Sequence, residues 1–193
     1  MKIQLVAAAM AMAAGVATAA PVTYKVDPTH TYPSFAADHM GGLSIWRGKF
    51  NSSSGTIVYD KAGKAGTVDI TIDMASIDYG NEKLNEHAKG ADVFDVAKYP
   101  TATFKGKLGG FKGEAPTQVV GELTLHGVTK PVTLAINSFM CKPPMPPMNK
   151  TEHCGADAGA TINRADFGVD YGAKFGFKMD VALQIQVEAV APQ

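Results

Sequence analysis

The first candidates for acid–base or metal chemistry in this chain are four histidines: His30, His39, His87 and His126. No two of them stand at the HExxH spacing, which would place two imidazoles on one helical face around zinc. His39 shares the strand phase of Phe35 and could line an interior. His87 falls in a helical segment, and His126 lies on the outward phase of its strand. Each could bind the polar head of a ligand at the mouth of a barrel, or be a structural histidine with satisfied hydrogen bonds.

Arginine is rare, since Arg47 and Arg164 are the only two in the sequence. A planar guanidinium suits a diphosphate head group because it makes bidentate contacts. Arg164 and Asp166 flank a bend before the last expected strand. The favoured interpretation is a local salt bridge between them that fixes the turn, and head-group binding by Arg164 is the alternative.

Two cysteines, Cys141 and Cys154, flank a segment rich in proline and methionine. In an oxidising compartment an even pair is expected to form a disulfide, here closing a loop without regular structure of its own. The soft or imidazole ligands in or beside this loop are Met140, Met145, Met148 and His153. Thioether sulfur suits Cu(I), so a copper-binding loop is an alternative that a free thiolate pair would favour. Otherwise methionine fills gaps and proline stiffens the loop.

The sequence contains no constellation of residues that requires catalysis. Residues 42–46, GLSIW, lack the last glycine of a nucleophile elbow. The glycine-rich stretch 106–113 has no GxGxxG spacing. Carboxylates are frequent, but they fall on the wet phases of the expected strands. We therefore predict a binding protein and not an enzyme, without a cofactor or a bound metal.

Alternation with a period of two dominates the chain and predicts antiparallel strands. It is clearest in residues 119–136, VVGELTLHGVTKPVTLAI, which indicate two half-buried strands around a tight connection. Further strands are expected at residues 23–27, 32–39, 45–50, 56–60, 67–77, 101–108, 156–163 and 177–189. Residues 81–98 break the period and predict a lid helix, capped by Asp78 or Asn81 and ended or bent by Gly90.

About eight antiparallel strands with one-sided alternation predict an all-β fold, an eight-stranded up-and-down barrel with one short lid helix. Such a barrel can be filled by side chains or hold one small ligand. The small residues on its inward face are Ala37, Gly48, Ala102, Gly106, Gly121 and Ala160. They would leave volume for a ligand, although glycine at strand bends is the alternative explanation.

Residues 1–19 are typical of a secretory signal peptide, with Lys2, an apolar run and the small-x-small sequence Ala17-Thr18-Ala19. A buried N-terminal helix is the alternative. Residues 20–193 then make one domain with a sizeable core. We expect this domain to be soluble and periplasmic, without a transmembrane segment. The formal net charge of the whole chain is +0 at pH 7, which argues against nucleic-acid binding.

Several segments, taken in order, resemble the YceI-like family of exported lipocalin-like barrels that carry polyisoprenoid or other long-chain lipids. The strongest match is residues 121–132, GELTLHGVTKPV. The others are DPTH at 27–30, residues 35–39, GKF at 48–50, NEH at 85–87, DVFD at 92–95, YP at 99–100, TF at 103–104 and NRADFG at 163–168. The resemblance implies a lipocalin-like barrel and an isoprenoid ligand, such as a quinone tail or a polyprenyl phosphate.

We therefore expect a periplasmic carrier that holds a long-chain isoprenoid lipid inside its barrel. The expected walls are Phe35, Trp46, Phe50, Ile70, Ile72, Phe104, Leu123, Leu134 and Leu183. His39, His87 and Arg164 are expected near the head group. The alternatives are an exported metal or redox accessory protein that uses residues 140–154, and a filled barrel with an interaction role only. An exposed edge strand could also pair two barrels into a homodimer.

Overall fold

The computed structural model describes residues 20–193, so the predicted signal peptide at residues 1–19 lies outside the described residues. The strands are β1 (Val22–Val26), β2 (Tyr32–His39), β3 (Ser44–Phe50), β4 (Ser53–Asp60), β5 (Ala65–Asp73), β6 (Ile77–Asp78), β7 (Thr101–Gly109), β8 (Gln118–Leu125), β9 (Val128–Lys142), β10 (His153–Asn163) and β11 (Asp180–Val190). The helices are η1 (Met74–Ser76), α1 (Glu82–Lys89), η2 (Arg164–Phe167) and η3 (Ala173–Phe175). Among residues 20–193, no helix has the length and apolar character needed to cross a membrane.

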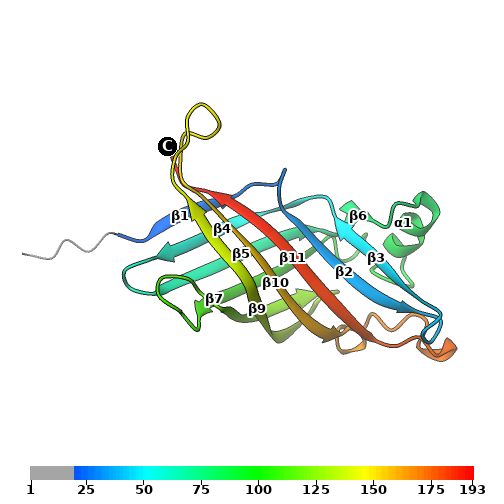
Figure 1. Cartoon of the computed structure of the whole chain (residues 1–193). Coiled ribbons are helices and arrows are strands. Elements are labelled where there is room, and N and C mark those ends of the chain that lie inside the picture. The colour runs from blue at the N-terminus through cyan, green and yellow to red at the C-terminus, as the bar shows by residue number, and fades with distance from the viewer. Residues whose placement is uncertain (1–19) are drawn as a thin grey trace, which may run out of the picture.

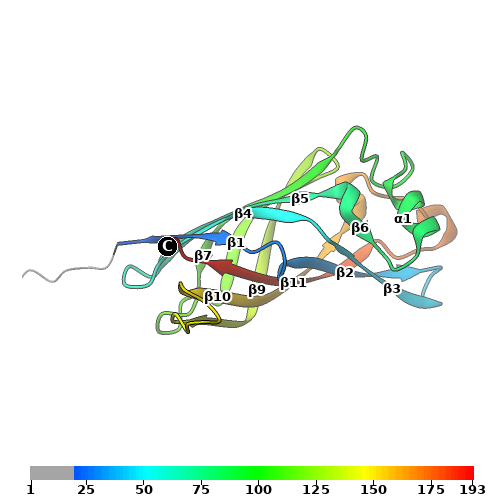
Figure 2. The same cartoon turned by 90° about the horizontal axis from the view of Figure 1, so that it is seen from above.

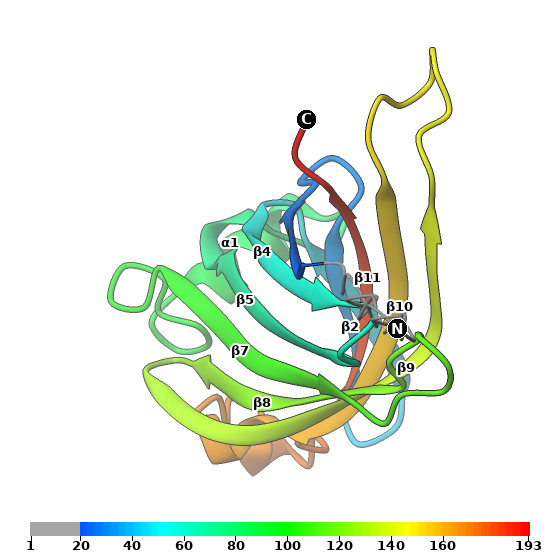
Figure 3. The same cartoon turned by 90° about the vertical axis from the view of Figure 1, so that its left-hand side faces the viewer.

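Eight strands form a closed antiparallel ring in the order β1-β4-β5-β7-β8-β9-β10-β11, and pairing of β1 with β11 closes it (Figure 3). The other three strands prolong this ring toward α1 (Figure 1). There β2 pairs with β11, β3 with β2, and β6 with β3. At three places around the barrel, the wall is therefore built from two successive strands that follow one another along the barrel. These pairs are β1 with β2, β3 with β4, and β5 with β6. The structure confirms the closed eight-stranded antiparallel barrel with one helix.

A two-residue turn joins β8 to β9, which confirms the tight connection between two strands and makes it shorter than expected. His126 and Gly127 both have positive φ, at 51° and 75°, which matches the twist of a tight hairpin. His126 therefore lies in the turn and not on the outward phase of a strand. Its Nδ1 lies 3.3 Å from the Phe167 carbonyl oxygen, and its ring packs against Tyr99 with centroids 4.3 Å apart. This histidine has a structural role in joining the hairpin to η2.

The lid helix α1 is shorter than residues 81–98. Asn81 caps its start by accepting a hydrogen bond from the Leu84 N–H, and Gly90 ends it. Residues beyond Gly90 form turns and no further helix, so of the two predicted roles for Gly90, ending the helix is the one that the structure shows. The buried Asn85 accepts a hydrogen bond of 2.7 Å from the Tyr79 N–H. This bond fastens α1 to the segment that follows β6, at one end of the barrel (Figure 2).

The first histidine of the sequence fixes the connection between β1 and β2. Asp27 accepts hydrogen bonds from the Thr29 N–H and hydroxyl, at 2.8 and 2.7 Å, and its other oxygen lies 2.7 Å from His30 Nδ1. These bonds, the one to His30 foremost, lower the pKa of Asp27 to about 2. His30 is thus an exposed residue of the connection before β2 and does not line the interior.

The predicted disulfide between Cys141 and Cys154 is present and joins directly paired residues of β9 and β10. Both strands run further than predicted, so the irregular part of the loop is only residues 143–152. The loop projects beyond the ring of strands (Figure 3). A cross-link over 13 residues stabilises the fold by about 3 kcal/mol, chiefly by restricting the unfolded chain.

Candidate ligand-binding cavity

An apolar cavity of about 400 Å³ lies inside the barrel, between the strands and α1. Its size falls in the range of small-molecule sites in proteins. A smaller apolar cavity of about 100 Å³ lies toward β1 and the disulfide. The two cavities share the lining residues Pro33, Ile70, Phe104, Leu134 and Ile185. The interior is therefore an elongated apolar space and not a barrel filled throughout by side chains.

All twelve residues predicted to contact a ligand line the larger cavity. They are Phe35, His39, Trp46, Phe50, Ile70, Ile72, His87, Phe104, Leu123, Leu134, Arg164 and Leu183. Eleven of them were assigned from the phase of a strand or from the helix, and Arg164 from its position at a bend. The other two candidate histidines, His30 and His126, are not among the lining residues. Whether any lining residue binds a ligand stays a prediction.

The inward glycines do not create the volume, contrary to expectation. A β carbon on Gly48 would lie 2.6 Å from the Phe35 ring, and one on Gly121 would lie 2.9 Å from the Phe104 ring. These glycines therefore let an aromatic ring lie directly against the backbone of a strand. Of the small inward residues, Ala37 and Ala102 do line the cavity.

Aromatic rings surround the two histidines of the cavity. The imidazole of His39 stacks on Trp46, with centroids 4.3 Å apart and planes 19° apart, and meets the edge of Phe177 at 5.3 Å. His87 from α1 meets the edge of Tyr171 at 4.8 Å. The polar ring atoms are thus placed in an otherwise apolar wall. Such a wall can orient a polar head group while it excludes water from the tail.

Arg164 does not form the predicted salt bridge with Asp166. Its Nη1 donates to the Val169 carbonyl and its Nη2 to the Tyr171 carbonyl, both at 2.7 Å. Burial lowers the pKa of the guanidinium from its usual value, although the group stays cationic at any physiological pH. Two of its five N–H donors are used by these carbonyls. Arg164 therefore folds the connection after η2 over the cavity and brings a positive charge to it.

Asp38 is a buried carboxylate at the cavity that the alternation did not identify. The period of two assigns it to the face opposite Phe35 and His39, yet it lines the cavity where β2 ends. Its Oδ2 accepts from the Lys178 N–H at 3.0 Å and the Gly41 N–H at 2.9 Å. These bonds, the one from Lys178 foremost, lower the pKa of the carboxyl. Its Oδ1 is buried and has no hydrogen-bond partner among residues 20–193, an arrangement that costs free energy unless a donor arrives.

Further lining residues come from connections, where a strand period gives no signal. Tyr79 follows β6, and its ring meets the edge of Phe35 at 5.4 Å. Burial raises the pKa of the Tyr79 phenol to about 12. Phe94, Tyr171 and Phe177 also line the cavity from connecting segments. Connecting segments outside the regular strands thus add several aromatic side chains to the lining of the cavity.

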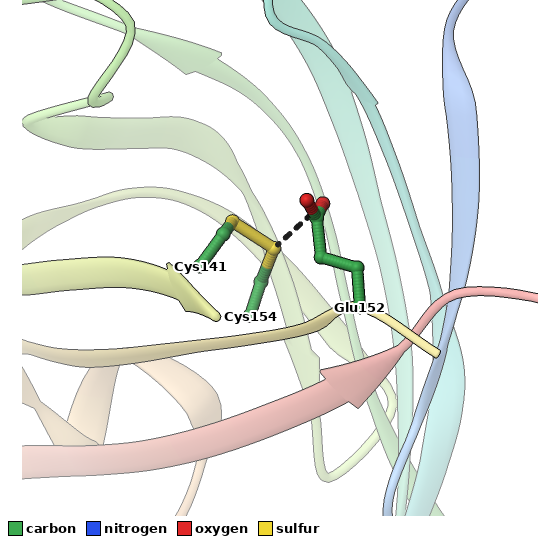
Figure 4. A group of neighbouring side chains, drawn as sticks. All are labelled: Cys141, Glu152 and Cys154. Carbon is green, nitrogen blue, oxygen red and sulfur yellow. Dashed lines mark hydrogen bonds between the residues drawn. A yellow bond between two sulfur atoms is a disulfide. The ribbon is translucent and has the colours of Figure 1, made fainter. Parts of the chain in front are cut away.

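A second cluster of potential ligand atoms lies at the base of the projecting loop. Cys141 and Cys154 Sγ and a Glu152 carboxylate oxygen all lie within 4.8 Å of one another (Figure 4). The Cys154 sulfur, 3.8 Å from Glu152 Oε1, carries no proton while the disulfide is formed. Glu152 also accepts from Lys61 Nζ, at 2.7 and 2.8 Å, and from the Tyr24 hydroxyl. In the oxidised protein these groups fasten the loop to β1 and to the turn that follows β4.

Comparison with known proteins gives one family over almost the whole described chain. A family model described as a YceI-like domain matches residues 24–189. A UPF0312 protein of Pseudomonas putida is 34% identical over 183 residues, which are 93% of this chain and 91% of that protein. A UPF0312 protein of Vibrio cholerae is 31% identical over 175 residues, or 90% and 89% of the two chains. The match to UPF0312 proteins of Vibrio vulnificus, 36% identical over 120 residues, spans 63% of their length.

Solved structures show the same fold. A YceI protein of Campylobacter jejuni is 26% identical, with a TM-score of 0.65 over 78% of this chain and 88% of that one. BcnA of Burkholderia cenocepacia is 24% identical, with a TM-score of 0.65 over 82% and 96% of the two chains. A polyisoprenoid-binding domain from Saccharophagus degradans is 17% identical, with a TM-score of 0.60 over 89% and 99%. The last two likenesses concern the fold alone.

Proposed function

The chain belongs to the YceI-like family, and on that basis we propose that it is a periplasmic protein that binds a long-chain isoprenoid lipid inside its barrel. The observation that carries the proposal is the elongated apolar cavity, lined by rings and aliphatic side chains from almost every strand. The fold relative from Saccharophagus degradans is described as polyisoprenoid-binding, which supports the same ligand class.

Removal of the lipid tail from water would drive binding. Each buried CH₂ group contributes about 0.8 kcal/mol, so affinity would rise with chain length until the cavity is filled. The walls are held by the sheet and by α1, and a preformed site limits the entropy that is lost on binding. This proposal does not involve catalysis. The groups at the cavity would bind and orient a ligand, and neither task needs a nucleophile–base pair.

The charges near the cavity favour a quinone-type head over a polyprenyl phosphate. Arg164 and Asp38 are close enough for the carboxylate charge to influence the guanidinium. A quinone carbonyl could accept from Arg164, and the hydroxyl of the reduced form could donate to Asp38 Oδ1. A phosphate would bring its negative charge beside the buried carboxylate, which is unfavourable. We therefore propose a neutral, hydrogen-bonding head group.

Native mass spectrometry of the protein purified from its periplasm, followed by organic extraction, tests this proposal. We expect an adduct of defined mass whose extract contains a prenylated quinone. A prenyl phosphate in the extract would keep the carrier function and contradict the head-group argument. Protein at its bare mass that takes up neither added quinone nor added prenyl phosphate would overturn the proposed function.

Metal binding at the loop is the rival function, supported by the cluster of Cys141, Glu152 and Cys154. It requires reduction of the disulfide by a dithiol, which frees two thiolates for Cu(I). The rival then predicts that Cu(I) raises the Tm of the reduced protein and that Met140→Leu with Met145→Leu abolishes the rise. If lipid binding is the function, we expect no Tm shift from Cu(I) in either redox form. Differential scanning fluorimetry of both redox forms decides between them.

A further inference from the structure

Large apolar side chains are exposed on two turns at the end of the barrel that carries α1. Leu43 is 73% exposed and Met40 is 56% exposed, both on the turn between β2 and β3. Phe175 is 72% exposed, in η3. The β2–β3 turn and the orange segment with η2 and η3 lie at the same end of the molecule in both views (Figures 1 and 2). Ile45, at the start of β3, is 50% exposed, and together we call Met40, Leu43, Ile45 and Phe175 the rim.

The two turns form one connected surface. The carboxylate of Asp38 accepts from the Gly41 N–H of one turn and from the Lys178 N–H beside the other. A β carbon on Gly41 would lie 3.0 Å from the Gly176 carbonyl oxygen, so the backbones of the two turns are in contact. The rim side chains are therefore held beside each other by hydrogen bonds and close packing, and they can act together on one flat partner.

Positive charge accompanies the rim. Residues 40–47 (MGGLSIWR) and 171–178 (YGAKFGFK) contain Arg47, Lys174 and Lys178 and no acidic residue. All three basic residues are exposed. Apolar side chains flanked by lysine and arginine are typical of surfaces that lie in the interface of an anionic bilayer. The hydrocarbon of the rim enters the headgroup layer while the cations meet lipid phosphates.

The rim continues into the interior of the barrel. Trp46, Tyr171 and Phe177 belong to the same two segments as the rim, and all three line the large cavity. An outer hollow between β3 and α1 shares Trp46, Tyr79, Leu84 and His87 with that cavity. The exposed turns and the cavity wall are thus adjacent parts of the same two segments, so a bilayer that covered the rim would lie next to the cavity.

We propose that the rim, with Arg47, Lys174 and Lys178, docks the mouth of the barrel onto an anionic phospholipid bilayer. This inference goes beyond the proposed function, because it concerns the outer surface and holds whatever ligand the cavity takes. Docking at the mouth would spare a lipid the passage through water between the bilayer and the cavity.

Flotation with vesicles of phosphatidylglycerol, compared with vesicles of phosphatidylcholine, tests the docking surface. We expect the protein to partition onto phosphatidylglycerol vesicles and salt to weaken the partitioning. The variant Leu43→Ser with Phe175→Ser is expected to lower the partition coefficient on the order of 30-fold. The matched control is Met148→Ser, because Met148 is 85% exposed on the projecting loop at the other end. It is expected to partition like the unchanged protein.

A second readout locates the contact. Trp46 is the only tryptophan of the chain, and it lies beside the rim. Brominated phosphatidylglycerol is therefore expected to quench its emission in the unchanged protein and not in the double variant. Equal partitioning of the double variant, or loss of partitioning in Met148→Ser, would overturn the proposal, as would a soluble dimer formed through the rim. Uptake of a prenyl quinone from detergent separates the two proposals. If the protein takes up the quinone but does not dock on vesicles, only the docking surface is overturned. If the protein docks but takes up no quinone, only the carrier function is overturned.

Discussion

Ala102→Phe is expected to weaken binding of a prenyl quinone on the order of 50-fold while the barrel stays folded. Ala102 is 3% exposed and lines the large cavity from β7. A phenyl ring there takes the place of about three ligand methylenes, each of which contributes about 0.8 kcal/mol when buried. Because the ring enters a space of about 400 Å³, it overpacks the core much less than the same change in a filled barrel would.

Titration with the quinone, followed by quenching of Trp46 fluorescence, measures this effect. The matched control is Val120→Phe, since Val120 on the neighbouring strand β8 is 51% exposed. The control adds the same ring to the outside of the barrel and is expected to bind like the unchanged protein. If Ala102→Phe unfolds at the same temperature and binds with unchanged affinity, the ligand does not occupy the cavity.

Gly121→Ala is expected to lower the free energy of unfolding by about 3 kcal/mol. Gly121 on β8 pairs with Gly106 on β7. A β carbon at Gly121 would lie 2.4 Å from the Lys105 carbonyl oxygen and 2.8 Å from the Gly106 α carbon. Both neighbours are backbone atoms of the paired strand and cannot rotate away, so the strands must separate locally. The added methyl would also push the Phe104 ring toward the cavity.

Chemical denaturation with the disulfide intact measures this change, and Gly155→Ala is its control. Gly155 also lies in a strand, but its nearest neighbours, Glu188 Cγ and the Val187 carbonyl oxygen, would be 3.6 Å from a β carbon. That is an ordinary contact. The control variant is expected to be unchanged or more stable by about 0.5 kcal/mol, because alanine restricts the unfolded chain. Equal losses in the two variants would show that the close approach of β7 and β8 is not the cause.

The strands and the walls of the cavity could be predicted from the sequence because both depend on one period. In a barrel, the apolar phase of each strand faces the interior. Ile70, Ile72 and Leu123 could therefore be assigned to the cavity wall without knowledge of the strands that pair with theirs. A tight connection in the hairpin of β8 and β9 and the cap at Asn81 could be predicted for a similar reason, since they depend on a few adjacent residues, although the placement of His126 in the turn was not predicted. The disulfide between Cys141 and Cys154 was predicted from the even number of cysteines and the expected oxidising compartment, and not from the pairing of β9 with β10.

The rest of the site depends on contacts between distant parts of the chain. Asp38 lines the cavity because its carboxylate accepts hydrogen bonds from backbone N–H groups of two separate parts of the chain. The alternation of apolar and polar residues along a strand gives no information about such bonds. Tyr79 and Tyr171 lie in connections, where no period applies. Gly121 was predicted to leave volume, yet its role is set by the Phe104 ring and by the register between β7 and β8. That register cannot be read from either strand alone.

The pairing of β1 with β11 determines the order in which this molecule can fold. β11 is the last strand of the chain, and it pairs with β10, β2 and β1. Until it is in place, β1, β2 and β10 each have an edge without a partner and the apolar interior stays open to water. Contacts between the two ends of a chain form slowly, and unpaired edges recruit other chains. The C-terminal strand is therefore the closing step of folding, and a chain that stops before it is an open sheet prone to aggregation.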